Sequence, residues 1–174
     1  MTDLFLERTF DEPLTRDDVL DGARESKTCF DIYRVQWHGS FLSNDGRSMI
    51  CRFSAADLES ARQALRDPDV DLSRFWAGMV YDGANPLPPN VVVARSFAAP
   101  VKFEDIAALG LAKSWCFETH RVKHVRSFHS LDGKRMLCWY AAPDAEAVRA
   151  AQREASMPVE SVWAGALISH GENT

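Results

Sequence analysis

The fold is decided by two stretches of sequence that lie 87 positions apart. Residues 29–53 read CFDIYRVQWHGSFLSNDGRSMICRF, and residues 116–140 read CFETHRVKHVRSFHSLDGKRMLCWY. The same shift aligns Arg8 with Arg95, and it aligns the triplet Trp-Ala-Gly at 76–78 with the one at 163–165. A single shift that fits so many infrequent residue types without a gap indicates a tandem repeat.

A turn-rich segment separates the two copies. Residues 82–90 read DGANPLPPN, and prolines interrupt helices and strands and favour an extended spacer. We therefore predict repeat 1 over residues 1–81, a linker over 82–90 and repeat 2 over 91–170.

Each copy predicts the same succession of secondary structure. The expected elements of the first copy are strand 4–6, a helix capped by Thr15, strand 35–42, strand 49–53, a helix capped by Asp57 and strand 75–80. Asp-Gly pairs at 45–46 and 132–133 are typical of hairpin turns. The order β-α-β-β-α-β is that of a ferredoxin-like unit, so we expect an α+β fold. We also expect the two antiparallel sheets to face each other as an internal pseudo-dimer.

Composition excludes several classes of protein. The chain has 174 residues and a net charge of −5, so it lacks the basic excess that nucleic-acid binding requires. It has no apolar stretch of membrane-spanning length and no secretion signal at its start, and we expect a cytoplasmic protein that binds neither nucleic acid nor membrane. Its four cysteines are expected to be reduced and to serve packing. Since the partner surface would be internal, we expect a monomer.

Motifs in both copies point to one family. They are Glu7-Arg8-Thr9-Phe10, Pro13, Cys29, Val35-Gln36-Trp37, Ser40-Phe41, Asp45-Gly46, Cys51 and Asp57, then Ser127-Phe128, Asp132-Gly133-Lys134, Cys138-Trp139-Tyr140, the run 142–149 and Met157-Pro158. Together they resemble a bacterial family of small, dimeric ferredoxin-like proteins of unknown function, sometimes called nickel-binding proteins. The resemblance implies the same fold, here in tandem, and nickel or another divalent metal as a ligand.

Histidines that such family members commonly carry are missing from this chain. Gly39 and Arg126 stand where the second strand would have one, and Ala64 and Ala151 stand at the helical position. A metal site would therefore need other ligands. Neutral imidazole is the usual ligand of nickel and zinc, so the candidates are His124 and His38, with Glu7 from the family's Glu-Arg pair. The alternative is that these histidines lie at the surface or at sheet edges.

A second candidate site follows from the repeated arginines, Arg8 and Arg95, each of which interrupts an apolar strand. Strand alternation predicts that His124 and Arg126 share one face, with His129 on the other. A half-apolar face with aromatic walls and cations suits a small anion or carboxylate. The candidate ligand-binding residues are Arg8, Arg95, His124, Arg126, Tyr140 and Trp37. The alternative is that the two arginines bridge acidic residues between the copies.

Three functions stay open at this point. The first is a protein that binds a small ligand or a divalent metal. The second is a small cofactor-free enzyme, monooxygenase-like or isomerase-like, with a pocket at the sheet face or between the lobes; this rests on analogy of fold. The third is a structural or interaction module with no small ligand. The sequence does not decide whether the protein is an enzyme.

Overall fold

A computed structural model of the chain describes residues 1–170, which fall into two compact units, residues 1–78 with 166–170 and residues 79–165. The elements that begin in the first unit are β1 (Thr2–Thr9), α1 (Arg16–Glu25), α2 (Lys27–Tyr33), β2 (Gln36–Ser43), β3 (Ser48–Ala55), α3 (Leu58–Ala64) and β4 (Phe75–Asp82). Those that begin in the second are β5 (Val91–Ser96), α4 (Phe103–Ala112), α5 (Ser114–Thr119), β6 (Lys123–Ser130), β7 (Arg135–Ala141), α6 (Ala145–Glu154) and β8 (Ser161–Ile168).

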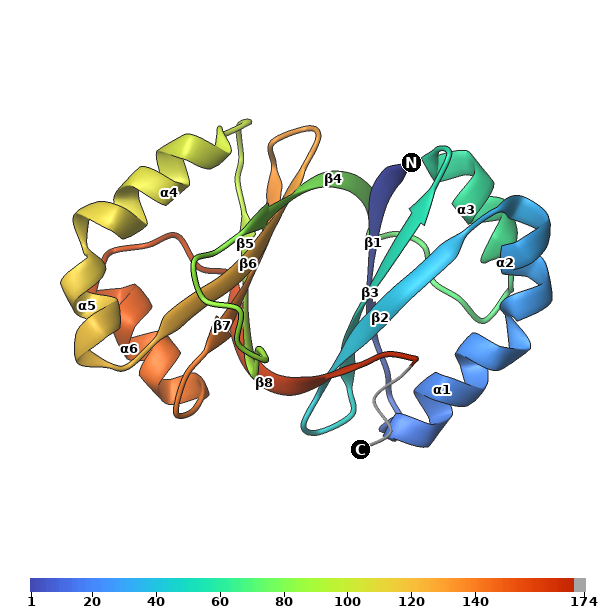
Figure 1. The fold of residues 1–174 in the computed structure, drawn as a ribbon, viewed down its shortest axis with the longest axis horizontal. Coiled ribbons are helices and arrows are strands. Elements are labelled where there is room, and N and C mark those ends of the chain that lie inside the picture. The colour runs from blue at the N-terminus through green and yellow to red at the C-terminus, as the bar shows by residue number, and fades with distance from the viewer. Residues whose placement is uncertain (171–174) are drawn as a thin grey trace. The chain divides into compact units, whose positions relative to one another are not determined.

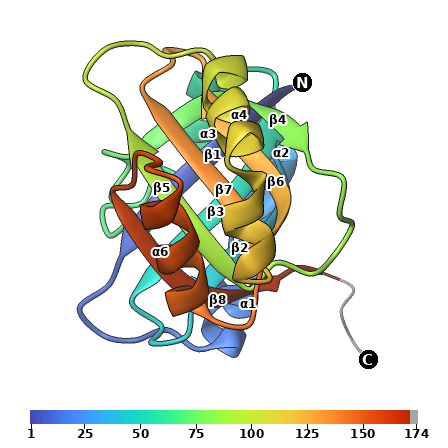
Figure 2. The same cartoon turned by 90° about the vertical axis from the view of Figure 1, so that its left-hand side faces the viewer.

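Within each unit the strands form an antiparallel sheet. The order is β4-β1-β3-β2 in the first unit and β8-β5-β7-β6 in the second. Helices α1, α2 and α3 cover one face of the first sheet (Figure 1), and α4, α5 and α6 cover one face of the second (Figure 2). The predicted α+β class is confirmed, and each sheet order is that of a ferredoxin-like unit. Duplication and the apposition of the two sheets stay predictions.

Local sequence explains where the elements begin. Thr15 forms a capping box with Asp18 at the start of α1, and Asp57 and Asp144 accept hydrogen bonds from the first turns of α3 and α6. The caps predicted at Thr15 and Asp57 are confirmed, and Asp144 is the equivalent of Asp57 in the second unit. The Asp-Gly hairpins also form, and Gly46 takes a φ of 72° that few side chains tolerate.

The structure corrects the predicted faces of β2 and β6. Each strand contains a β-bulge, between Trp37 and Gly39 in β2 and between His124 and Arg126 in β6. A bulge inserts one extra residue, so the alternation of side chains reverses beyond it. His124 pairs with Tyr140, whereas Arg126 pairs with Trp139 on the other face. The prediction that His124 and Arg126 share a face, opposite His129, was therefore wrong.

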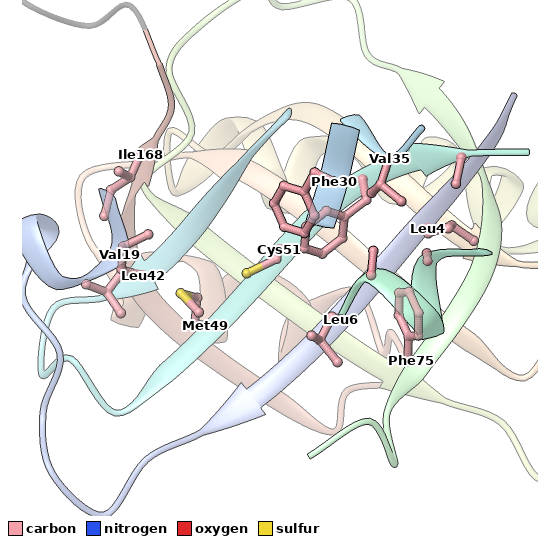
Figure 3. Packing of buried hydrophobic residues seen from close by; sticks show 14 residues of the cluster. Leu4, Leu6, Val19, Phe30, Val35, Leu42, Met49, Cys51, Phe75 and Ile168 are labelled. Carbon is pink, nitrogen blue, oxygen red and sulfur yellow. The ribbon is translucent and has the colours of Figure 1, made fainter. Parts of the chain in front are cut away.

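Each unit has a hydrophobic core between its sheet and its helices. In the first unit Leu4, Leu6 and Phe75 belong to the same buried cluster as Phe30 (Figure 3). The rings of Phe30 and Phe53 meet edge to face, with their centroids 5.7 Å apart. The core of the second unit contains Val91, Val93, Ile106, Met136, Tyr140 and Val148. The helix-covered face of each sheet also carries an arginine, Arg8 in the first unit and Arg95 in the second.

The predicted linker contains no helix or strand from Gly83 to Asn90. It is nevertheless tied to the second unit, because Asn85 donates to the His124 carbonyl and Asn90 bonds to both backbone groups of Ala142. Its role as a domain boundary stays a prediction. Over residues 1–170 no helix has the length and apolar character needed to cross a membrane.

Candidate functional site

A pocket of about 210 Å³ opens between α1, α2 and the helix-covered face of the first sheet. Its wall is largely apolar and includes Leu6, Phe30 and Phe53. The polar side chains that line it from the sheet are Arg8, Trp37, Ser40 and Cys51. The first unit therefore combines an apolar, aromatic wall with one cation, the combination that the sequence predicted for this face.

Arg8 comes from β1 and is half-buried. Its guanidinium lies over the ring of Phe10, 4.8 Å from the centroid. Hydrogen bonds from Ser73 lower the pKa of the exposed Asp71 carboxyl, and the Arg8 charge adds a smaller effect of the same sign. Within residues 1–170 the Arg8 guanidinium forms no hydrogen bond or ion pair, so its N–H groups are available to a ligand.

The floor of the pocket is a short chain of hydrogen bonds. Trp37 Nε1 donates to Ser40 Oγ at 3.0 Å, and Ser40 Oγ donates to Cys51 Sγ at 2.8 Å. Burial raises the pKa of the Cys51 thiol to about 11. Because the thiolate is the nucleophilic form, Cys51 is a packing residue and a hydrogen-bond acceptor at neutral pH.

The second unit places the corresponding arginine differently. Arg95 is fully buried. It donates to the Pro158 carbonyl at 2.6 Å, to Gln152 Oε1 at 2.9 Å and to the Tyr140 hydroxyl at 3.2 Å. All three acceptors are neutral, and the Arg95 Nε has no hydrogen-bond partner in the part of the chain that the structure describes. The side chain thus fills the interior of its unit.

Beside Arg95 lies a second chain of hydrogen bonds, which parallels the one in the first unit. His124 Nε2 bonds to Ser127 Oγ at 2.7 Å, and Ser127 Oγ donates to Cys138 Sγ at 3.2 Å. Burial lowers the pKa of His124, and the nearby Arg95 charge lowers it further. The imidazole is therefore neutral at neutral pH, and one of its nitrogens is already occupied.

The structure brings together only some of the predicted ligand-binding residues. Arg95, His124 and Tyr140 share one face in the second unit, and Arg8 and Trp37 share the pocket in the first. Arg126 is on the opposite face of its sheet, where its Nε donates to Asp82 Oδ1 at 2.5 Å. The bulge after His124 is the physical reason for this separation.

Sequence reasoning missed Gln152, which completes the Arg95 network from α6. One signal could have found it: Gln152 is a polar residue on the apolar face of its helix, beside Val148 and Ala151. The position 87 residues earlier is Leu65, which cannot accept a hydrogen bond. At this position the second unit has an acceptor for its buried arginine, whereas the first unit has an apolar side chain that lines its pocket.

The candidate metal ligands do not converge. Glu7 Oε1 accepts from Trp76 Nε1 at 2.9 Å, and His38 Nε2 bonds to Ser54 Oγ at 2.8 Å. Glu7 pairs with Ile50 of β3, four residues from Ser54. Over residues 1–170 no three His, Cys, Asp or Glu side chains are close enough to hold a metal ion. The residues present in the described chain do not fit a nickel site.

Comparisons with known proteins agree with the fold. No curated protein matches the sequence. An anthrone oxidase-like protein of known structure is similar at 12% identity and a TM-score of 0.52, over 99% of this chain and 94% of that one. A candidate chlorite dismutase is similar at 11% identity and a TM-score of 0.50, over 98% and 95%. At such identities the likeness concerns the fold alone.

A family model matches much of the second unit. The match covers residues 92–164, which include Arg95, the bulged strand β6 and Gln152. The family is described as nickel-responsive SCO4226-like proteins, and over residues 92–164 this confirms the resemblance that the motifs of the second copy indicated. Residues 92–164 of this chain thus carry the sequence pattern of the nickel-responsive SCO4226-like family.

Proposed function

We propose that the first unit binds a small organic monocarboxylate in the pocket beside Arg8. The observation that carries this proposal is the contrast between two corresponding arginines. Arg95 has three acceptors inside its unit, whereas Arg8 has none among residues 1–170 and borders an open pocket. A buried or half-buried cation gains most from a charged acceptor, so a ligand carboxylate would complete the Arg8 environment.

The neighbours of the two arginines support this interpretation. Tyr140 and Gln152 supply acceptors to Arg95, and the residues 87 positions earlier are Phe53 and Leu65, which line the pocket. The first unit therefore has apolar surface where the second has hydrogen-bonding groups. Apolar surface of this kind favours a ligand with a hydrophobic body beside its charged group.

Size and charge limit the ligand further. A volume of about 210 Å³ is below the roughly 300–1,000 Å³ typical of pockets for drug-sized molecules. The pocket is also lined by Asp18 and Glu25 of α1 and by Asp67, which follows α3. These acids would repel a ligand with several negative charges, so a phosphate ester or a dicarboxylate is disfavoured. A single ring or a short chain with one carboxylate fits best.

The test is titration of the full chain with benzoate, followed by calorimetry and by the NMR signal of the Trp37 indole. We expect saturable binding and a shift of that signal, and no comparable binding of the neutral isostere benzyl alcohol. Arg8→Met should weaken benzoate binding about tenfold, the effect of one lost charge-assisted contact. Arg24→Met is the matched control, because Arg24 lies on the same side of the unit in α1 but pairs with Asp21. Equal binding by both variants would refute the proposal.

A second variant tests the contrast directly. Phe53→Tyr combined with Leu65→Gln gives the first unit the acceptors of the second. We expect Arg8 to turn inward and fill the pocket, and benzoate binding to be lost although Arg8 is intact. Retained affinity would show that the two residues do not control the pocket.

Divalent metal binding is the second candidate function, and the match of residues 92–164 to the nickel-responsive family favours it. Calorimetric titration of metal-free protein with nickel, with zinc as the control, decides this point. Tight binding of about one nickel ion per chain that is lost in His124→Ala would support a site in the second unit. Because no ligand cluster is present in the described residues, we expect only weak binding.

We also propose the tandem organisation as predicted, with repeats over 1–81 and 91–170 joined by the linker 82–90. If the repeats pair internally, the chain is a monomer, and a dimer mass in sedimentation would contradict this. Two alternatives remain. A catalytic role would require turnover of a ligand that binds beside Arg8, and a structural or interaction module would bind no small ligand.

A further inference from the structure

We propose that the second unit carries a separate binding site for a small amphipathic carboxylate, in a groove between α6 and the start of β8. The groove has a volume of about 340 Å³. From α6 it is lined by Arg149, Gln152 and Arg153, and from the following segment by Met157, Val159 and Val162. This site is independent of the Arg8 pocket, because it lies in the other unit and shares no residue with it.

Gln152 is the observation that points to a ligand. Its side chain is 1% exposed, and its Oε1 is used by Arg95. Its Nε2 has no hydrogen-bond partner within residues 1–170. A buried amide N–H without an acceptor is costly, because it has lost its hydrogen bonds to water, and few such groups occur in native proteins. An acceptor atom bound in the groove would satisfy it.

The charges around the groove indicate that this acceptor is anionic. Arg149 is held at the groove, since its Nη2 donates to the Val162 carbonyl at 2.8 Å. Within residues 1–170 the only ion pairs of Arg149 and Arg153 are long ones with the exposed Glu146, at 3.4 and 3.5 Å. Exposed pairs of this length contribute little, so the positive charges of both arginines remain available to a ligand carboxylate, Arg149 from its place at the groove.

The remaining acid of the groove does not oppose an anion. Glu160 also lines it, but Glu160 Oε2 pairs with Arg135 at 2.5 Å and Oε1 accepts from Ser96. The charge of Glu160 is therefore compensated by Arg135 of β7. Met157, Val159 and Val162 provide apolar surface for the body of the ligand. Together these groups fit a carboxylate with a short aliphatic chain.

The first unit offers a natural comparison. Residues 87 positions before Arg149 and Arg153 are Arg62, which lies in α3, and Arg66, which follows the end of that helix. The residue corresponding to Gln152 is Leu65, which has no amide. If the buried amide is essential to recognition, the site exists only in the second unit.

The experiment is NMR titration of the full chain with hexanoate, read at the Gln152 side-chain amide and at the backbone amides of 159–162. We expect saturable shifts there. Arg153→Ala should weaken binding about tenfold. Because the Arg153 side chain is exposed, the fold should be retained, and an otherwise unchanged spectrum of the variant checks this. Arg66→Ala is the matched control and should leave the affinity unchanged.

Four outcomes would overturn the proposal. One is the absence of any shift at Gln152 with hexanoate. Another is an equal response to hexanol, which has the chain but no charge, or to inorganic phosphate, which has the charge but no chain. The last is equal weakening by Arg66→Ala and Arg153→Ala. Because shifts at Trp37 report the Arg8 pocket and shifts at Gln152 report this groove, failure of one site is distinguishable from failure of the other.

Discussion

Replacing Arg95 by Met tests whether the buried network stabilises the second unit. The variant keeps an unbranched side chain but removes the donors to Tyr140, Gln152 and Pro158. Hydrogen bonds from a charged donor contribute about 1.5–3 kcal/mol each, and burying the charge itself costs several kcal/mol that the variant recovers. The balance predicts a loss of about 2–5 kcal/mol in the free energy of unfolding.

A compensating variant isolates the cause. Adding Tyr140→Phe and Gln152→Leu to Arg95→Met replaces the polar network by an apolar cluster, with the residue types found at Phe53 and Leu65. Only a carbonyl is then left without its donor, so we expect the triple variant to regain more than half of the lost stability. Urea unfolding at neutral pH, followed by near-UV circular dichroism, measures both variants.

The control for this series is Arg8→Met. Since the Arg8 guanidinium has no hydrogen bond or ion pair within residues 1–170, its removal should cost less than about 1 kcal/mol, mainly from the contact with Phe10. The reasoning is refuted if the free energy of unfolding of Arg95→Met is within about 0.5 kcal/mol of the wild-type value, or if the triple variant is no more stable than the single one.

Three further predictions concern the backbone and pH. Gly46→Ala should lower stability by at least about 2 kcal/mol, because φ is positive there and a Cβ would lie 2.4 Å from the Leu14 carbonyl oxygen; thermal melting measures the loss. Asp144→Ala should cost about 1 kcal/mol through the lost N-cap bond to Ala147, and Asp144→Asn should retain most of it. Burial lowers the pKa of His124, so the stability due to its neutral form is fully present above about pH 6.5 and is lost as the pH falls through the folded-state pKa. The free energy of unfolding of His124→Gln should therefore fall less between pH 8 and pH 5 than that of the wild type.

Local chemistry explains which parts of the fold were predictable. An Asp before a helix accepts from the first turn whatever packs around it, so Asp57 and Asp144 could be assigned without the fold. An Asp-Gly pair likewise specifies its own turn. The succession of elements in each unit followed from these signals and from apolar periodicity.

The faces of β2 and β6 were not predictable by counting along the strand. A bulge depends on how one strand meets its neighbour, and no single residue type encodes it. Gly39 gave a partial signal, since an isolated Gly in a strand often marks a bulge, and its φ is 134°. The corresponding residue of the second unit is Arg126, which gives none. The error therefore fell on Arg126, the residue that the structure separates from the other candidates.

Side-chain environment, rather than strand position, distinguishes the two arginines. Arg8 and Arg95 occupy equivalent places in the sheet order, yet one is half-buried beside a pocket and the other is fully buried. Burial of a guanidinium is costly unless it finds hydrogen-bond acceptors, and Arg95 finds them in Tyr140, Gln152 and the Pro158 carbonyl. The residues at 140 and 152 are therefore one difference between an arginine with internal acceptors and an arginine without them. This argues for searching for function in the unit whose arginine lacks internal partners.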